Sequence, residues 1–282
     1  MIGSVTRKLS DRSPGGGRLS IEDTARTRWG LSILGIVLLL ALWQAVTATL
    51  DLNPKYFPGP LGVVEELVRI WPAIVAALPN TLSAAIVGYL LALVLSIAVA
   101  VPLVANERVL DALMPFIIGT NTVPRIAMTP LVIYWVSFYT VSALYLANYV
   151  MAVWVAFFPM LIAALDGFRS IDEDTENMLQ LYGATTWQEF KHVRFKKGLP
   201  FIFDGMKIGF VLAMIGAVVG EFVSGTFGIG SQAASAIGRT SIARAFAIVL
   251  VLGLISTAVV LVVFLVESRV IFWRESSVMG EG

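Results

Sequence analysis

The stretch DEDTENMLQLYGATTWQEFKHVRFKKGLPFIFDGMKIG, residues 172–209, decides how the chain is organised. It is the long charged interval of a sequence that is otherwise strongly apolar. Within it, Glu176 is followed by a glycine at Gly183 and by a Leu-Pro pair at Leu199 and Pro200. Apolar segments long enough to cross a bilayer lie before and after it. The part of this interval up to residue 200 is therefore predicted to be an extramembrane loop between two membrane spans.

The composition supports a membrane protein. Hydrophobic residues make up 57% of the chain, charged residues 14%, and the mean hydropathy is +0.84, whereas soluble domains carry about 25% charged residues. The net charge of +1 gives no reason to expect a nucleic-acid partner. Cysteine is absent and His192 is the single histidine, so we predict no metal site and no cofactor bound by this chain.

The order of apolar and polar segments predicts an all-α polytopic membrane protein with six transmembrane helices. The predicted spans are residues 29–50, 81–104, two within 111–166, 201–222 and 245–266. The predicted domains are a flexible cytoplasmic tail (1–28), a first span with its extracytoplasmic connection (29–80), a core (81–274) with a cytoplasmic loop (170–200), and a C-terminal tail (275–282).

Two details of the spans follow from individual residues. The run 29–50 exceeds the apolar core of a signal peptide and favours a retained anchor. Five prolines and several charges place 51–80 outside the membrane, with a short amphipathic helix over 62–71. The pair of spans within 111–166 is divided near 137–142, and the prolines of its first half predict a kinked or discontinuous helix.

Most of the 20 basic residues fall on the side of the N-terminus when six spans are counted. Basic residues concentrate on the cytoplasmic side of membrane proteins. Both termini and the charged loop are therefore predicted to be cytoplasmic.

The charged loop has two interpretations. Its acids, apolar residues and glycine break suit short helices that seat in a groove of a cytoplasmic partner. The same features also suit an amphipathic loop that lies on lipid without a partner.

The loop resembles the cytoplasmic EAA loop of ABC-importer permeases. Gly183-Ala184, Trp187-Gln188 and the Leu-Pro at 199 have the family spacing, although the Glu-Ala-Ala of the family falls on residues 177–179 and Glu176 lies one position early. The residues that the resemblance assigns to coupling with an ATPase are Glu176, Asn177, Met178, Leu179, Tyr182, Gly183, Ala184, Leu199 and Pro200.

The resemblance extends beyond the loop. Pro124-Arg125-Ile126-Ala127 with Pro130-Leu131 and Trp135 is similar to a segment of the nitrate, taurine, alkanesulfonate and pyrimidine-precursor permeases. Such a permease has a type I ABC-importer fold and is a homodimer in the lipid bilayer of the bacterial inner membrane. Its partners are cytoplasmic ATP-binding subunits, which bind ATP and Mg²⁺, and an extracytoplasmic solute-binding protein. In keeping with this division, the chain contains no Gly-Lys pair and thus no phosphate loop.

Polar residues within or near the spans are candidates for the translocation pathway or a gate. They are Asn121, Thr122, Arg125, Thr129, Asn148 and Glu221. Arg125 either contacts an anionic solute or extends to lipid headgroups. Glu221 is either an outer gate or docking element, or a carboxylate at a helix end.

Two other functions compete with the permease of a small solute. A self-contained secondary transporter of a small anion would need coupling carboxylates at mid-membrane, and none is clearly placed there. A membrane-embedded enzyme would need an acid, a base and a nucleophile within the spans, and the spans contain no such group of residues. The sequence thus favours a non-catalytic importer subunit that moves its solute by alternating access.

Overall fold

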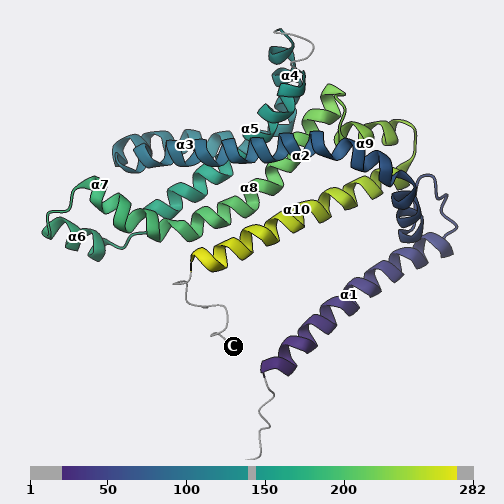
Figure 1. Ribbon diagram of the computed structural model, residues 1–282, viewed down its shortest axis with the longest axis horizontal. Coiled ribbons are helices and arrows are strands. Elements are labelled where there is room, and N and C mark those ends of the chain that lie inside the picture. The colour runs from purple at the N-terminus through teal and green to yellow at the C-terminus, as the bar shows by residue number, and fades with distance from the viewer. Residues whose placement is uncertain (1–20, 139–143, 272–282) are drawn as a thin grey trace, which may run out of the picture. The chain divides into compact units, whose positions relative to one another are not determined.

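The computed structural model describes residues 21–138 and 144–271, and the regular elements in these ranges are helices (Figure 1). In chain order they are α1 (Ile21–Thr49), α2 (Pro60–Val104), α3 (Glu107–Thr122), the 3₁₀ turn η1 (Arg125–Met128), α4 (Thr129–Ser137), α5 (Leu144–Arg169), α6 (Glu173–Leu181), α7 (Thr186–Glu189), the π-helical turn η3 (Phe190–Arg194), α8 (Phe195–Ser224), α9 (Ile229–Gly238) and α10 (Ile242–Val270).

The chain forms two units, Met1–Leu52 and Asn53–Gly282. The first contains α1, which begins at Ile21, earlier than the expected residue 29. Its segment Gly30–Thr49 is long and apolar enough to cross a membrane, as predicted. The part of the predicted N-terminal tail before residue 21 and the C-terminal tail after 271 lie outside the described residues.

The centre of the second unit is the pair α5 and α8. Glycines recur along one side of α8 at intervals of seven and four residues, so that the two backbones approach closely. A Cβ added to Gly216 would lie 2.5 Å from the carbonyl oxygen of Met151. Close approach of this kind is the main source of helix association in lipid, where the hydrophobic effect is missing. The glycines of this side are Gly198, Gly205, Gly209, Gly216 and Gly220.

Helix α2 packs on this pair through small residues such as Ala84, Ala85 and Ala92. Its 45 residues correspond to about 68 Å, more than twice the ~30 Å hydrocarbon core. The expected break at residue 80 is therefore wrong, because the helix runs continuously from Pro60 through Pro72 and Pro79. A proline removes one backbone donor, and neighbouring helices can compensate for that loss.

The predicted discontinuous span is confirmed. Helix α3 and the segment Arg125–Ser137 form a pair bent by 83°. Five other helices are long and apolar enough to span a membrane, and the bent pair as one span raises this to six within the described ranges. The expected division near residues 137–142 coincides with the end of α4, and residues 139–143 lie outside the description.

The last two spans are longer than predicted. Helix α8 begins at Phe195 rather than near 201, so that Leu199 and Pro200 lie inside its first turns. Helix α10 covers Ile242–Val270 instead of residues 245–266. Helix α8 is about 45 Å long. The α6–α7 segment precedes it at one end, and the loop before α9 follows it at the other (Figure 1).

Candidate coupling surface and membrane clusters

The charged loop folds into two short helices with defined ends. The Asp172 carboxylate accepts a hydrogen bond from the amide of Thr175 at 3.0 Å and so caps α6. Gly183 has φ +70 and ends this part of the loop in the left-handed region. Thr185 and Gln188 then form a capping box that starts α7. The local sequence thus determines where each helix begins.

These helices and the turn between them expose large apolar side chains. Leu181 is 88% exposed, Tyr182 84% and Trp187 66%, and Met178 is also exposed. We call these four residues the α6–α7 surface. Helix α6 lies outside the candidate spans, and α7 is the first turn of the helix that continues to Ser224. Large apolar groups exposed at this end of that helix form a candidate contact surface.

Arg194 connects the two short helices through ion pairs to both. Its Nη2 lies 3.1 Å from Glu176 Oε1, and its Nε pairs with Glu189. Its side chain is only 14% exposed, and Nη1 also donates to the carbonyl of Phe168 at the end of α5. The arginine thereby connects α6, α7 and α5, and ion pairs in such a network are stronger than isolated surface pairs.

A second pair fastens the start of α6 to α8. Lys197 pairs with the Asp172 carboxylate. This hydrogen bond, followed by those from Thr175, holds the pKa of Asp172 well below its usual range. The carboxylate is therefore ionised at every physiological pH.

A cavity of about 450 Å³ lies between the end of α2 and this loop. Its lining includes Val104 and Glu107 on one side and Trp187 and Phe190 on the other, together with Arg194. This cavity separates the α6–α7 segment from the turn between α2 and α3.

The structure distributes the residues predicted for coupling unevenly. Asn177, Met178 and Tyr182 are exposed. Leu199 and Pro200 are not on this surface, because both lie within α8, and Leu199 packs against Phe203 and Val263.

Two residues of this region were not predicted from the sequence. Leu181 is the most exposed of the large apolar residues, and its place at the end of α6 gave no signal in the sequence. Arg194 is one of several similar basic residues in the loop, so that its role became visible only with its partners in place.

The other end of α8 contains a buried carboxylate, Glu221, which is 0% exposed. Its Oε2 accepts hydrogen bonds from the Thr81 hydroxyl at 2.9 Å and from the amide of Gly230 at 2.8 Å. The Thr81 oxygen accepts in turn from the amide of Ile229 at 2.9 Å. A Cβ on Gly228 would lie 2.2 Å from the carboxyl carbon, so that any other residue there would displace the carboxyl group.

We call Glu221, Thr81 and the first amides of α9 the Glu221 cluster. It connects α2, α8 and α9 through groups far apart in the sequence. The carboxyl group also lies at the N-terminal end of α9, where negative charge is favourable. Its role in the structure is to fasten α9 to the two spans.

Asn148 of α5 extends this polar region. Its Nδ2 donates to the Thr226 hydroxyl at 2.9 Å, and its Oδ1 accepts from Ser224 at 3.3 Å. Two residues from the predicted pathway set, Asn148 and Glu221, therefore support the same loop between α8 and α9.

The remaining predicted pathway residues lie elsewhere, at the bend between α3 and α4. Thr122 and Thr129 donate to carbonyls of their own segments, those of Gly119 and Ile126. Asn121 Oδ1 is buried without a hydrogen-bond partner among the described residues. Arg125 Nη1 donates to the carbonyl of Val155 at 2.7 Å. The predicted set is thus divided between two sites.

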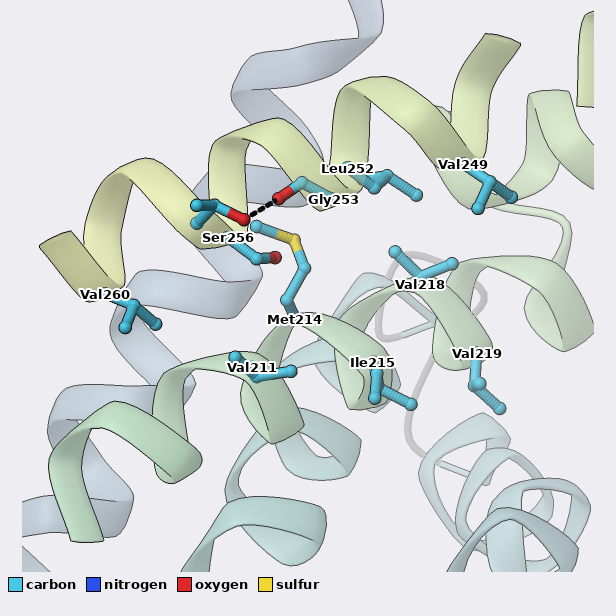
Figure 2. Close-up of a pocket in the computed structure, with 11 residues that line it drawn as sticks. Val211, Met214, Ile215, Val218, Val219, Val249, Leu252, Gly253, Ser256 and Val260 are labelled. Carbon is cyan, nitrogen blue, oxygen red and sulfur yellow. Dashed lines mark hydrogen bonds between the residues drawn. The ribbon is translucent and has the colours of Figure 1, made fainter. Parts of the chain in front are cut away.

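An apolar groove of about 510 Å³ lies between helices α8 and α10 (Figure 2). Figure 2 shows Met214 and Val218 of α8 pointing toward α10. None of the lining residues is charged, and Thr257 donates its hydroxyl to Gly253 of its own helix. The groove is lined by Val211, Met214, Ile215, Val218, Val219, Val249, Leu252, Gly253, Ser256, Thr257 and Val260.

Comparison with known proteins agrees with this architecture. Residues 88–272 match the family described as the inner membrane component of binding-protein-dependent transport systems. The riboflavin transport system permease protein RibX of Chloroflexus aurantiacus is 32% identical over 265 residues, which cover 91% of this chain and 95% of the relative. The formylaminopyrimidine transport permease protein ThiX of Halalkalibacterium halodurans is 29% identical, with 70% and 77% covered.

A third relative is the putative aliphatic sulfonates transport permease protein SsuC of Bacillus subtilis, 25% identical over 89% of this chain and 90% of its own length. These relatives support the importer interpretation rather than a self-contained secondary transporter. The apolar helices and the family match together lead to one conclusion. The chain belongs to the family of inner membrane components of binding-protein-dependent transport systems, and it is a multi-pass permease subunit of an ABC importer.

Proposed function

We propose that the α6–α7 surface is the contact through which a separate cytoplasmic ATP-binding subunit drives this permease. The observation that carries the proposal is the exposure of Leu181, Tyr182 and Trp187 on helices whose base is held by Arg194. An apolar surface on a fixed base can transmit force, because the partner's movement is not absorbed by the loop. ATP hydrolysis then belongs to the partner, and this chain has no catalytic role.

The rest of the proposal concerns the two sides of the membrane and a second copy of the chain. With the loop and both termini in the cytoplasm, the Glu221 cluster and α9 face the other side, where a solute-binding protein delivers the solute. Two copies of the permease enclose the pathway and alternate between inward-facing and outward-facing states. The names of the relatives support a small organic solute, such as a pyrimidine-like heterocycle or a sulfonate.

The test is co-purification with the ATP-binding subunit of the same transport system. Leu181→Asp and Tyr182→Asp place charges on the α6–α7 surface and are expected to release that subunit and to abolish ATP-dependent uptake. The matched control is Phe227→Asp, an equally large change at an exposed residue before α9. It should leave the ATP-binding subunit attached.

Retention of the ATP-binding subunit by both α6–α7 variants would refute the proposed contact. The solute is tested separately by uptake of labelled riboflavin, formylaminopyrimidine and an alkanesulfonate in cells with and without the chain. Uptake that is independent of the chain for all three compounds would exclude these solutes.

A further inference from the structure

Arg125 contacts α5 through the backbone carbonyl of Val155, which lies four residues before Pro159. Arg125 begins η1, directly after the break at Val123 and Pro124. Its Nη1 donates to the carbonyl oxygen of Val155 at 2.7 Å. Val155 is buried in the middle of α5, so water does not easily reach this oxygen.

The carbonyl of Val155 lacks its usual partner because of Pro159. In an α-helix each carbonyl accepts from the amide four residues later, and residue 159 has no amide hydrogen. In a bilayer a backbone group freed in this way must find a donor from the protein. The guanidinium of Arg125 supplies that donor.

Another proline shows that this arrangement is not general. Pro102 lies inside α2 and removes the donor for the carbonyl of Ala98. Within residues 21–138 and 144–271, no side chain donates a hydrogen bond to that carbonyl. Pro102 is therefore a matched control for Pro159, since both lie within long membrane helices.

We propose that Arg125 is a positioning residue, which fixes the bend of the broken span to α5 through the carbonyl that Pro159 exposes. This role differs from both roles considered from the sequence, contact with an anionic solute and extension to lipid headgroups. The bend has no helical hydrogen bonds across it to maintain its angle, and the bond to α5 supplies a fixed point. This structural role does not depend on the proposed permease function. Only its effect on transport does.

The test is a double-mutant cycle on the purified chain in mixed micelles, with unfolding by SDS followed through tryptophan fluorescence. Arg125→Leu leaves the Val155 carbonyl without a donor and should raise the unfolding equilibrium constant by about ten- to hundred-fold. Pro159→Ala restores the amide. In the Pro159→Ala background the effect of Arg125→Leu should fall to about three-fold or less.

The same substitution in a Pro102→Ala background should retain its full effect. Arg125→Gln separates hydrogen bonding from charge, because glutamine is a donor without a charge. We expect it to restore most of the loss, whereas a solute or headgroup contact requires the cation and would be restored by Arg125→Lys alone.

A second measurement reports the geometry of the bend. The chain has no cysteine, so spin labels can be attached at Ile118→Cys and Tyr134→Cys, two exposed positions on α3 and α4. With labelled chains diluted in unlabelled ones, Arg125→Leu should broaden the distance distribution, and Pro159→Ala should narrow it again.

The proposal is overturned if Arg125→Leu has the same effect in the wild-type and Pro159→Ala backgrounds. It is also overturned if the double variant fails to accumulate while Pro159→Ala alone does. None of these measurements involves the ATP-binding subunit or the solute. Their outcome is therefore distinct from failure of the proposed coupling contact, which the co-purification measures.

Discussion

Replacing Thr81 by valine tests whether the Glu221 cluster fastens α9 to the spans. Valine has nearly the same shape as threonine but no hydroxyl group. The change removes the hydrogen bond to Glu221 at 2.9 Å and leaves the amide of Ile229 without its acceptor. All other contacts of the side chain are preserved.

The expected magnitude follows from these two bonds. A buried hydrogen bond contributes about 0.5–1.5 kcal/mol, and a buried amide left without a partner costs about 1–3 kcal/mol. The free energy of unfolding should therefore fall by about 2–4 kcal/mol. At about 1.4 kcal/mol for each factor of ten, the unfolding constant rises by roughly 30- to 1000-fold.

The matched control is Ser96→Ala, also on α2. Ser96 is 1% exposed, and its hydroxyl donates only to the carbonyl of Leu93 in its own helix at 2.9 Å. Its removal leaves no amide without a partner and should change the free energy by less than about 1 kcal/mol. Reversible SDS unfolding measures both variants, and Thr81→Ser, which keeps the hydroxyl group and loses one buried methyl group, should lose only about 1 kcal/mol.

A Thr81→Val variant no less stable than Ser96→Ala would refute this role of the hydroxyl group. The role is also refuted if Thr81→Ser is as unstable as the valine variant, since the serine hydroxyl can make both bonds. Either result would show that the cluster does not hold α9 in place.

Three further predictions concern helix packing and the loop. Gly216→Ala should lower the free energy of unfolding by about 1–3 kcal/mol, because its Cβ meets the backbone of α5, whereas Gly253→Ala, with no atom within 4 Å of its Cβ, should stabilise by about 0.5–1 kcal/mol; SDS unfolding of the two variants measures the contrast. Arg194→Leu leaves two carboxylates of the loop unpaired and should uncouple ATP hydrolysis from transport while the ATP-binding subunit stays bound, and an unchanged ratio of hydrolysis to uptake would contradict this. Because the pKa of Asp172 is lowered, this carboxylate stabilises the loop above its unfolded pKa of about 4, and the stabilisation is lost only as the pH falls below that value. Amide hydrogen exchange at the start of α6 should therefore be unchanged between about pH 7 and 5 and faster at about pH 3, after correction for intrinsic rates. A change already at about pH 6 would contradict the assignment to Asp172.

Several features of the fold followed from local sequence. The charge-free runs predicted the spans, because the length of a helix across lipid depends on apolar residues alone. The prolines between residues 115 and 130 predicted the broken span. Prolines were a poor guide over residues 60–80, where they favour a segment separate from the span that follows, although α2 runs through Pro72 and Pro79.

The sites were less predictable than the spans. Glu221 was identified as unusual because it is charged within an apolar segment. Its partner Thr81 is 140 residues away, and no spacing rule relates the two. Arg194 could not be distinguished from the other basic residues of its loop, since its role depends on where α5 ends in space. Leu199 and Pro200 follow the family spacing, but their position inside α8 depends on where that helix begins.

The unbroken run of α8 beyond Pro200 has a mechanical consequence. A continuous helix of about 45 Å behaves as a stiff lever, and a tilt of about 5° displaces its far end by about 4 Å. The α6–α7 segment is attached to one end of this lever and α9 to the other. A small displacement imposed at one end of α8 is therefore carried to α9 at the other end without any helix unfolding.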